Sequence, residues 1–184
     1  MHAQAVPPER AFGPTAEVSG YLIVAYLESA TAASRTFADR LRKQLAAVGI
    51  DRPTSDEWYP AAAFQTVLFE AADSLDDETL CRIGRQMASL SGVPDETDSP
   101  VAALSALDTA HGDAHRHVDD STTYELRDVD ESARTAVVAC PQIPYPGSVA
   151  TGAVAGVVDP HAARVDVETL SPEDDQLRFG VSWA

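Results

Sequence analysis

The chain has 184 residues, with 13 Lys or Arg against 29 Asp or Glu, so its formal net charge is −16. Hydrophobic residues make up 45 % and charged residues 23 %, which is ordinary for a folded domain and excludes wholesale disorder. Lys43 is the single lysine, and no Gly-rich loop precedes it. The sequence therefore excludes a nucleotide phosphate-binding loop.

The acidic residues are dispersed along the chain, and the longest acidic run covers only residues 76–78. This pattern predicts a halophilic protein whose carboxylates bind water and ions in a salt-rich cytoplasm. The alternative is an acidic surface made for one partner. Binding to nucleic acid is not expected, because it depends on Lys and Arg side chains that meet phosphates.

The beginning of the chain, residues 1–16, contains three prolines and lacks the charged-then-apolar pattern of a signal peptide. We expect a disordered leader over 1–16 and a single domain over 17–184. The longest apolar stretch, 21–27, is far shorter than the roughly 20 residues of a membrane span. A cytoplasmic protein is the expectation.

Helical periodicity covers the first two thirds of the chain. We expect five helices. The first covers 18–30, the second runs from Phe37 to a stop at Gly49, and the third lies around 64–71 with Pro60 in its first turn. The fourth runs from Asp76–Glu78 to Leu90, and the fifth begins after Ser99 as N-cap and continues through His111, as far as His117. A polar loop is expected over 92–99.

After residue 120 the period of hydrophobic residues changes to two, which is typical of strands. We expect strands at 124–126 and 135–140 around a turn at 128–132, a helix over 148–158, a strand from Val165, a turn at 171–175 and a last strand over 177–183. Gly152 and Gly156 are expected to pack that helix closely on the sheet. The predicted fold class is α+β, with an N-terminal helical part followed by a β-β-α-β-β antiparallel sheet unit.

The candidate site residues are Asp108, His111 and His115, on the last predicted helix of the first part. At about 100° per residue, both histidines fall within about 20° of Leu104 on the helical wheel, so they face the interior. Three interpretations stay open. The three side chains could bind a divalent metal, one imidazole could be the axial ligand of a haem, or the histidines could decorate a helix end that Gly112 interrupts.

The order of segments resembles that of the haem nitric-oxide/oxygen-binding (H-NOX) domain family. The segments that carry the resemblance are Gly20-Tyr21-Leu22-Ile23, Ala47-Val48-Gly49-Ile50, Trp58-Tyr59-Pro60, Leu80-Cys81-Arg82-Ile83-Gly84-Arg85, Leu104-Ser105-Ala106-Leu107-Asp108-Thr109-Ala110-His111 and Val165-Asp166-Val167-Glu168. The resemblance implies haem between the helical part and the sheet, His111 as its axial ligand, His115 as the alternative ligand, and NO or O2 on the other face of the haem.

One stretch departs from the family pattern. The family's Tyr-x-Ser-x-Arg motif, which holds the haem propionates, should fall between Cys140 and Gly147, and no matching Ser or Arg occurs there. Related haem-free domains of the 4-vinyl-reductase type share the architecture and hold small or acyl ligands. The resemblance therefore also fits a domain without haem.

The sequence thus predicts a non-catalytic sensory domain in signalling, which binds either haem with NO or O2, or a small apolar ligand. The alternative is a haem-free module that binds a small molecule, a signalling protein or a second copy of itself. A third hypothesis is a metal enzyme that uses Asp108, His111 and His115.

Overall fold

The computed structural model describes residues 12–91, 93–118, 124–140, 145–173 and 176–184. Its elements are β1 (Glu17–Ser19), α2 (Gly20–Ala33), α3 (Arg35–Ala47), β2 (Trp58–Pro60), α4 (Ala61–Ala72), α5 (Asp77–Ser89), α6 (Val93–Glu96), α7 (Pro100–Ala114), β3 (His115–Arg116), β4 (Glu125–Asp130), β5 (Thr135–Cys140), α8 (Gly147–Val158), the 3-10 turn η2 (Asp159–His161), β6 (Val165–Glu173) and β7 (Gln176–Trp183). No described helix is long and apolar enough to cross a bilayer.

Polar side chains cap the N-termini of α5 and α7, two helices that begin where the sequence predicts. The Ser99 hydroxyl accepts a hydrogen bond from the backbone N–H of Ala102 at 3.2 Å, and Pro100 opens α7. The Asp76 carboxylate accepts one from Thr79 N–H at 2.7 Å and caps α5. Gly49, with φ 87°, follows α3. The five predicted helices are confirmed.

Three details of the helical part differ from the prediction. The predicted loop 92–99 contains the short helix α6. Pro60 is the N-cap of α4 and the last residue of β2, so it precedes the first turn. Helix α7 ends at Ala114, because His115 and Arg116 turn extended and pair with β1. Strands of two or three residues, too short to show a period in the sequence, form the sheet β2-β1-β3.

The C-terminal part is an antiparallel sheet of order β4-β5-β7-β6, with α8 between β5 and β6 in the chain. The predicted β-β-α-β-β unit is therefore confirmed. Two turns shift: the β4–β5 turn covers 131–134, later than predicted, and β6 continues through 171–173, where a turn was expected.

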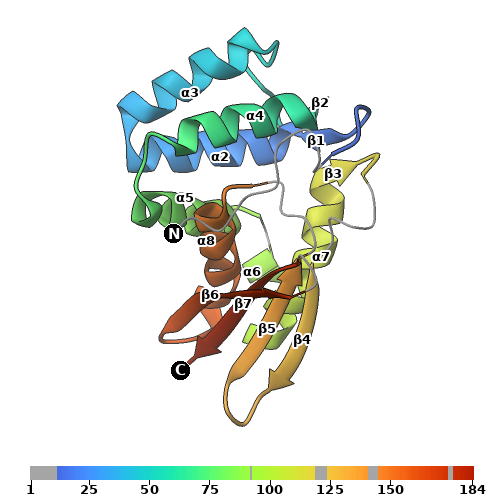
Figure 1. Ribbon diagram of the computed structural model, residues 1–184, viewed down its shortest axis with the longest axis vertical. Helices are drawn as coiled ribbons and strands as arrows, with labels where there is room; N and C mark the ends of the chain where they lie inside the picture. The colour runs from blue at the N-terminus through green and yellow to red at the C-terminus, as the bar shows by residue number, and fades with distance from the viewer. Residues whose placement is uncertain (1–11, 92, 119–123, 141–144, 174–175) are drawn as a thin grey trace.

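Helix α8 lies between α5 and the sheet (Figure 1). A Cβ built on Gly152 would lie 2.0 Å from the carbonyl oxygen of Cys81, and one on Gly84 would lie 2.0 Å from that of Val149. The glycines of α8 thus allow close approach to a helix, α5. The prediction that they face the sheet is wrong.

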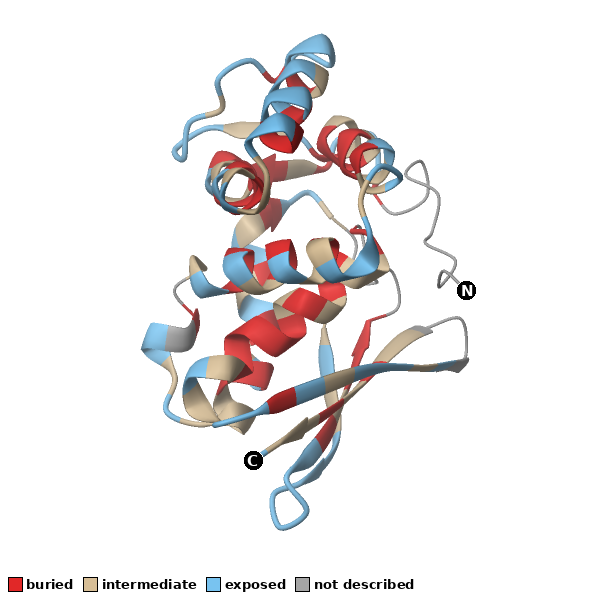
Figure 2. Cartoon of the chain, turned by 90° about the vertical axis from the view of Figure 1, so that its left-hand side faces the viewer, coloured by how far each residue is buried: buried red, intermediate tan, exposed pale blue. Residues whose placement is uncertain are grey.

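The buried side chains run through the middle of the molecule, along α8 and the faces that surround it (Figure 2). Part of the predicted leader belongs to this core, because Phe12 and Ala16 are buried. Residues 1–11 of that leader lie outside the described residues.

Candidate functional site

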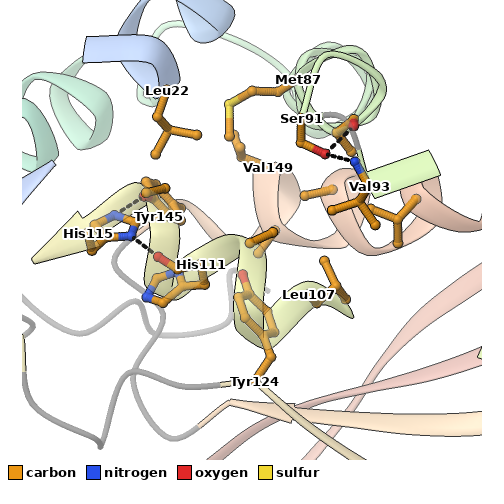
Figure 3. A pocket seen from close by; sticks show the side chains of 16 residues that line it. Leu22, Met87, Ser91, Val93, Leu107, His111, His115, Tyr124, Tyr145 and Val149 are labelled. Atoms are coloured by element: carbon orange, nitrogen blue, oxygen red, sulfur yellow. Dashed lines mark hydrogen bonds between the residues drawn. The ribbon is translucent and has the colours of Figure 1, made fainter. Parts of the chain in front are cut away.

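A cavity of about 80 Å³ lies where α2, α5, α7 and α8 meet (Figure 3). Its wall is mostly aliphatic, with two histidines and two tyrosines. The lining residues are Leu22, Met87, Ala88, Ser91, Val93, Leu107, Ala110, His111, Ala114, His115, Tyr124, Tyr145, Val149, Ala150, Ala153 and Val157. An engineered cavity of about 150 Å³ binds benzene, so this smaller cavity has room for a diatomic molecule or a short alkyl group.

His111 is the candidate ligand-binding residue that the sequence placed on an interior face, and it lies in the cavity wall. Its side chain comes from the last turn of α7 and is only 7 % exposed. The Nε2 atom is buried and has no hydrogen-bond partner among the residues that the structure describes. Burial, with a smaller contribution from neighbouring His115, lowers the pKa of His111 well below its usual value, so the ring is neutral at pH 7. An unpartnered neutral imidazole is available to a ligand.

His115, in contrast, uses both of its ring nitrogens. Its Nδ1 lies 2.9 Å from the backbone carbonyl oxygen of His111, and its Nε2 lies 2.5 Å from the hydroxyl of Tyr145. A carbonyl oxygen only accepts, so Nδ1 carries the proton, Nε2 accepts, and the Tyr145 hydroxyl donates. Burial lowers the pKa of His115 to about 4, although the hydrogen bond to His111 opposes this. The structure therefore leaves His111, and not His115, with a free ring nitrogen.

Aromatic rings pack around the two histidines. The rings of His111 and His115 have centroids 4.2 Å apart. Phe12, from the segment before β1, stacks on His115 at 5.3 Å, and Tyr124 meets His111 edge-on at 5.5 Å. Burial raises the pKa values of Tyr124 and Tyr145, so both phenols are neutral. The cavity wall therefore carries no charge at physiological pH.

The third predicted metal ligand, Asp108, lies elsewhere. It is exposed, and its carboxylate accepts a hydrogen bond at 3.1 Å from the backbone N–H of Tyr124. Among the described residues, no three His, Cys, Asp or Glu side chains gather closely enough to hold a metal ion. The structure brings His111 and His115 together. Asp108 stays on α7, where its carboxylate binds the backbone just before β4.

Tyr145 and Phe12 belong to the site but were not singled out from the sequence as site residues. Tyr145 follows residues 141–144. These four residues belong to the region where the propionate-binding motif was sought, and they lie outside the described residues. A buried tyrosine needs a partner for its hydroxyl. That requirement could have suggested a histidine as the partner of Tyr145. However, nothing in the sequence predicts a contact between Tyr145 and His115, which are 30 positions apart.

Comparison with solved structures identifies the fold. An H-NOX protein from K. algicida superposes with a TM-score of 0.65 over 90 % of this chain and 96 % of its own, at 12 % sequence identity. The fold is that of the H-NOX domains. An S. oneidensis H-NOX protein, solved in its Fe(II)NO state, gives 0.65 over 90 % and 99 %, at 10 % identity. An oxygen-binding H-NOX domain related to soluble guanylate cyclases gives 0.62 over 90 % and 94 %, at 12 % identity.

No family model and no curated protein matches the sequence. The H-NOX neighbours are haem-binding domains, so the site must be tested against haem. The free Nε2 of His111 suits an axial ligand to iron. However, a cavity of about 80 Å³ does not hold a porphyrin, and no Lys or Arg among the described lining residues could meet two propionates. The described residues supply an iron ligand but do not fit the whole group.

Proposed function

We propose that this chain is a non-catalytic sensory domain of the H-NOX fold that binds a small, uncharged ligand in the His111 cavity. The free His111 Nε2 atom in the cavity wall is the observation that carries the proposal. Leaving a buried polar atom unpaired costs about 1–3 kcal/mol, so a ligand that pairs with it is favoured. The size of the cavity and its neutral wall suit a diatomic gas or a short apolar molecule.

Binding is the function that this geometry supports, because the four ionisable side chains that face the cavity stay neutral and do not change protonation state near neutral pH. The pKa of each histidine is lowered and that of each tyrosine is raised, all four mainly by burial. General acid–base catalysis works best when the pKa lies near the working pH. The pKa values of these four side chains are shifted away from neutral pH, so the side chains bind and orient a ligand without exchanging protons with that ligand.

Xenon under pressure, followed by amide NMR, tests whether small apolar ligands enter the cavity. We expect shifts centred on His111, Ala114 and Val149. The variant Ala153→Leu, which adds bulk to the cavity wall, should abolish them, whereas Ala62→Leu on α4, outside the cavity, should leave them unchanged. Absence of shifts around His111 in the wild type would show that the cavity is closed and would refute the proposal.

Haem is the second candidate: the free His111 Nε2 atom and the fold favour it, whereas the size of the cavity opposes it. Haemin is added to the purified protein in high salt, and the absorption spectrum is recorded with and without CO. A Soret band that is lost in His111→Ala but retained in His115→Ala would establish haem on His111. No Soret band in the wild type would reject haem, and a band unaffected by His111→Ala would reject that ligand.

A sensory domain passes its ligand state to a partner, and we propose a signalling protein or a second copy of this chain. The proposal follows from the sensory role. Native mass spectrometry from volatile salt distinguishes monomer from dimer and shows any molecule that co-purifies. A ligand-free monomer that captures no signalling protein in pull-downs from its source, with or without xenon, would contradict it.

A further inference from the structure

A second hollow borders the His111 cavity. It is a groove of about 550 Å³ beside α6, α7 and β2, much larger than the cavity. Five side chains line both hollows: Leu22, Ser91, Val93, Ala110 and Ala114. Leu22 is the longest aliphatic side chain among them, and it extends from α2 toward the space between His115 and Met87 (Figure 3). The cavity and the groove therefore share a thin wall of small or rotatable side chains.

The groove differs from the cavity in its chemistry. Besides the shared residues it is lined by hydroxyl groups, a tryptophan and two carboxylates: Ser19, Tyr21, Ser55, Trp58, Thr97, Thr109, Glu96 and Asp113, with Ala106. Glu96 comes from α6 and Asp113 from α7, so two elements place negative charge around one space.

Within the described part of the chain, no Lys or Arg lines the groove. The guanidinium of Arg116 lies 4.5 Å from the centre of the Trp58 ring, and its Nε donates to the Glu17 carboxylate at 2.5 Å. Since that cation is already paired, Glu96 and Asp113 determine the sign of charge that the groove attracts. The groove therefore favours a cationic group over an anionic one.

We propose that the cavity and the groove form one site for a small cationic amphiphile, such as an alkylammonium compound. Its short apolar end occupies the cavity beside His111, and its ammonium head lies in the groove near Glu96 and Asp113. This inference rests on the proposed function and extends it, because the ligand needs an apolar end that fits about 80 Å³. A two-part ligand would match a neutral cavity that lies directly beside an acidic, hydroxyl-rich groove.

Three probes that share a four-carbon alkyl chain and differ in the head group test the proposal: n-butylammonium, n-butanol and n-pentanoate. Each is titrated into the labelled protein and followed by amide NMR, at the lowest salt that preserves the folded spectrum, because salt screens the head-group interaction. We expect n-butylammonium to shift amides of both hollows and to bind most tightly, and n-pentanoate to bind most weakly.

Variants of the two carboxylates assign the head group. Glu96→Gln and Asp113→Asn should each weaken n-butylammonium binding by roughly two- to five-fold, as expected for one partly exposed ion pair, and leave n-butanol binding unchanged. Glu70→Gln is the matched control, because it removes one exposed negative charge near the C-terminal end of α4, outside both hollows. It should leave all three affinities unchanged.

The outcomes separate this inference from the proposed function. Equal binding of the three probes, or ammonium binding insensitive to Glu96→Gln and Asp113→Asn, would overturn the head-group assignment. If xenon enters the cavity but n-butylammonium does not bind, the joined site is wrong while the small-ligand site remains. If neither xenon nor n-butylammonium shifts the amides around His111, both proposals fall.

Discussion

The hydroxyl of Tyr145 donates a hydrogen bond to Nε2 of His115 at 2.5 Å, and both side chains are buried. This bond joins the segment that leads into α8 to the residue that follows α7. The tautomer of His115 is determined by its other ring nitrogen, because Nδ1–H donates to the carbonyl oxygen of His111 and Nε2 is left to accept from Tyr145. The bond thereby holds the end of α7 next to the start of α8 in the cavity wall. The Nε2 atom of the neighbouring His111 ring is not used by this bond.

The first prediction concerns loss of this bond. Tyr145→Phe removes the donor and leaves His115 Nε2 buried without a partner, so we expect the free energy of unfolding to fall by about 1–3 kcal/mol. Urea denaturation at constant salt measures it. Tyr59→Phe is the control, because its hydroxyl bonds Thr54 and Glu57 at an exposed site. Equal losses in both variants would show that burial of the Tyr145–His115 pair is unimportant.

The second prediction concerns pH. The pKa of His115 is about 4 in the folded protein, below the roughly 6.5 expected when unfolded. Between these values the unfolded state binds more protons, so stability falls as pH falls from about 6.5 to about 4, and this contribution is constant below pH 4. The total loss due to His115 is on the order of 3 kcal/mol.

Titrating carboxylates also change stability in this range, so a reference variant is needed. The double variant His115→Phe/Tyr145→Phe removes the titrating ring and the hydroxyl bonded to it together, so neither the Tyr145 hydroxyl nor the Nε2 atom of His115 is left unpaired. We expect the wild type to lose stability relative to this variant as the pH is lowered from 7 to 4.5 in urea denaturation series. Parallel pH profiles for the two proteins would contradict the assignment to His115.

The same contacts show what the sequence could and could not predict. The helices, the β-β-α-β-β order and the interior position of His111 follow from periodicity and caps, which are local properties. The pairing of His115 with β1 was missed, because two-residue strands have no period. The partnership of Tyr145 with His115 and the packing of Phe12 were missed, because they depend on tertiary contacts. The resemblance in segment order predicted the fold, whereas the cavity size needed the structure.

The third prediction tests the contact between Phe12 and His115. Phe12 is 8 % exposed and covers the His115 ring, so Phe12→Ala should admit water to it. We therefore expect the pKa of His115 to rise from about 4 toward its usual value, as measured by NMR titration of the ring protons. Phe37→Ala, which removes a buried ring from α3, should leave that pKa unchanged. An unchanged pKa in Phe12→Ala would mean that other residues keep His115 dry.

The last prediction uses one substitution at two glycines. In Gly152→Ala the new Cβ would lie 2.0 Å from the carbonyl oxygen of Cys81, so α5 and α8 must separate, and we expect a loss of roughly 1–3 kcal/mol or more in unfolding free energy. In Gly112→Ala the new Cβ meets nothing within 4 Å, and alanine favours the helix, so we expect a gain of about 0.5–1 kcal/mol. Chemical denaturation measures both. Opposite signs would show that close approach of α5 to α8 requires Gly152, while a gain in both variants would show that the helices repack without cost. Because α5 and α8 both line the His111 cavity, xenon shifts in Gly152→Ala then report whether their spacing sets the size of the site.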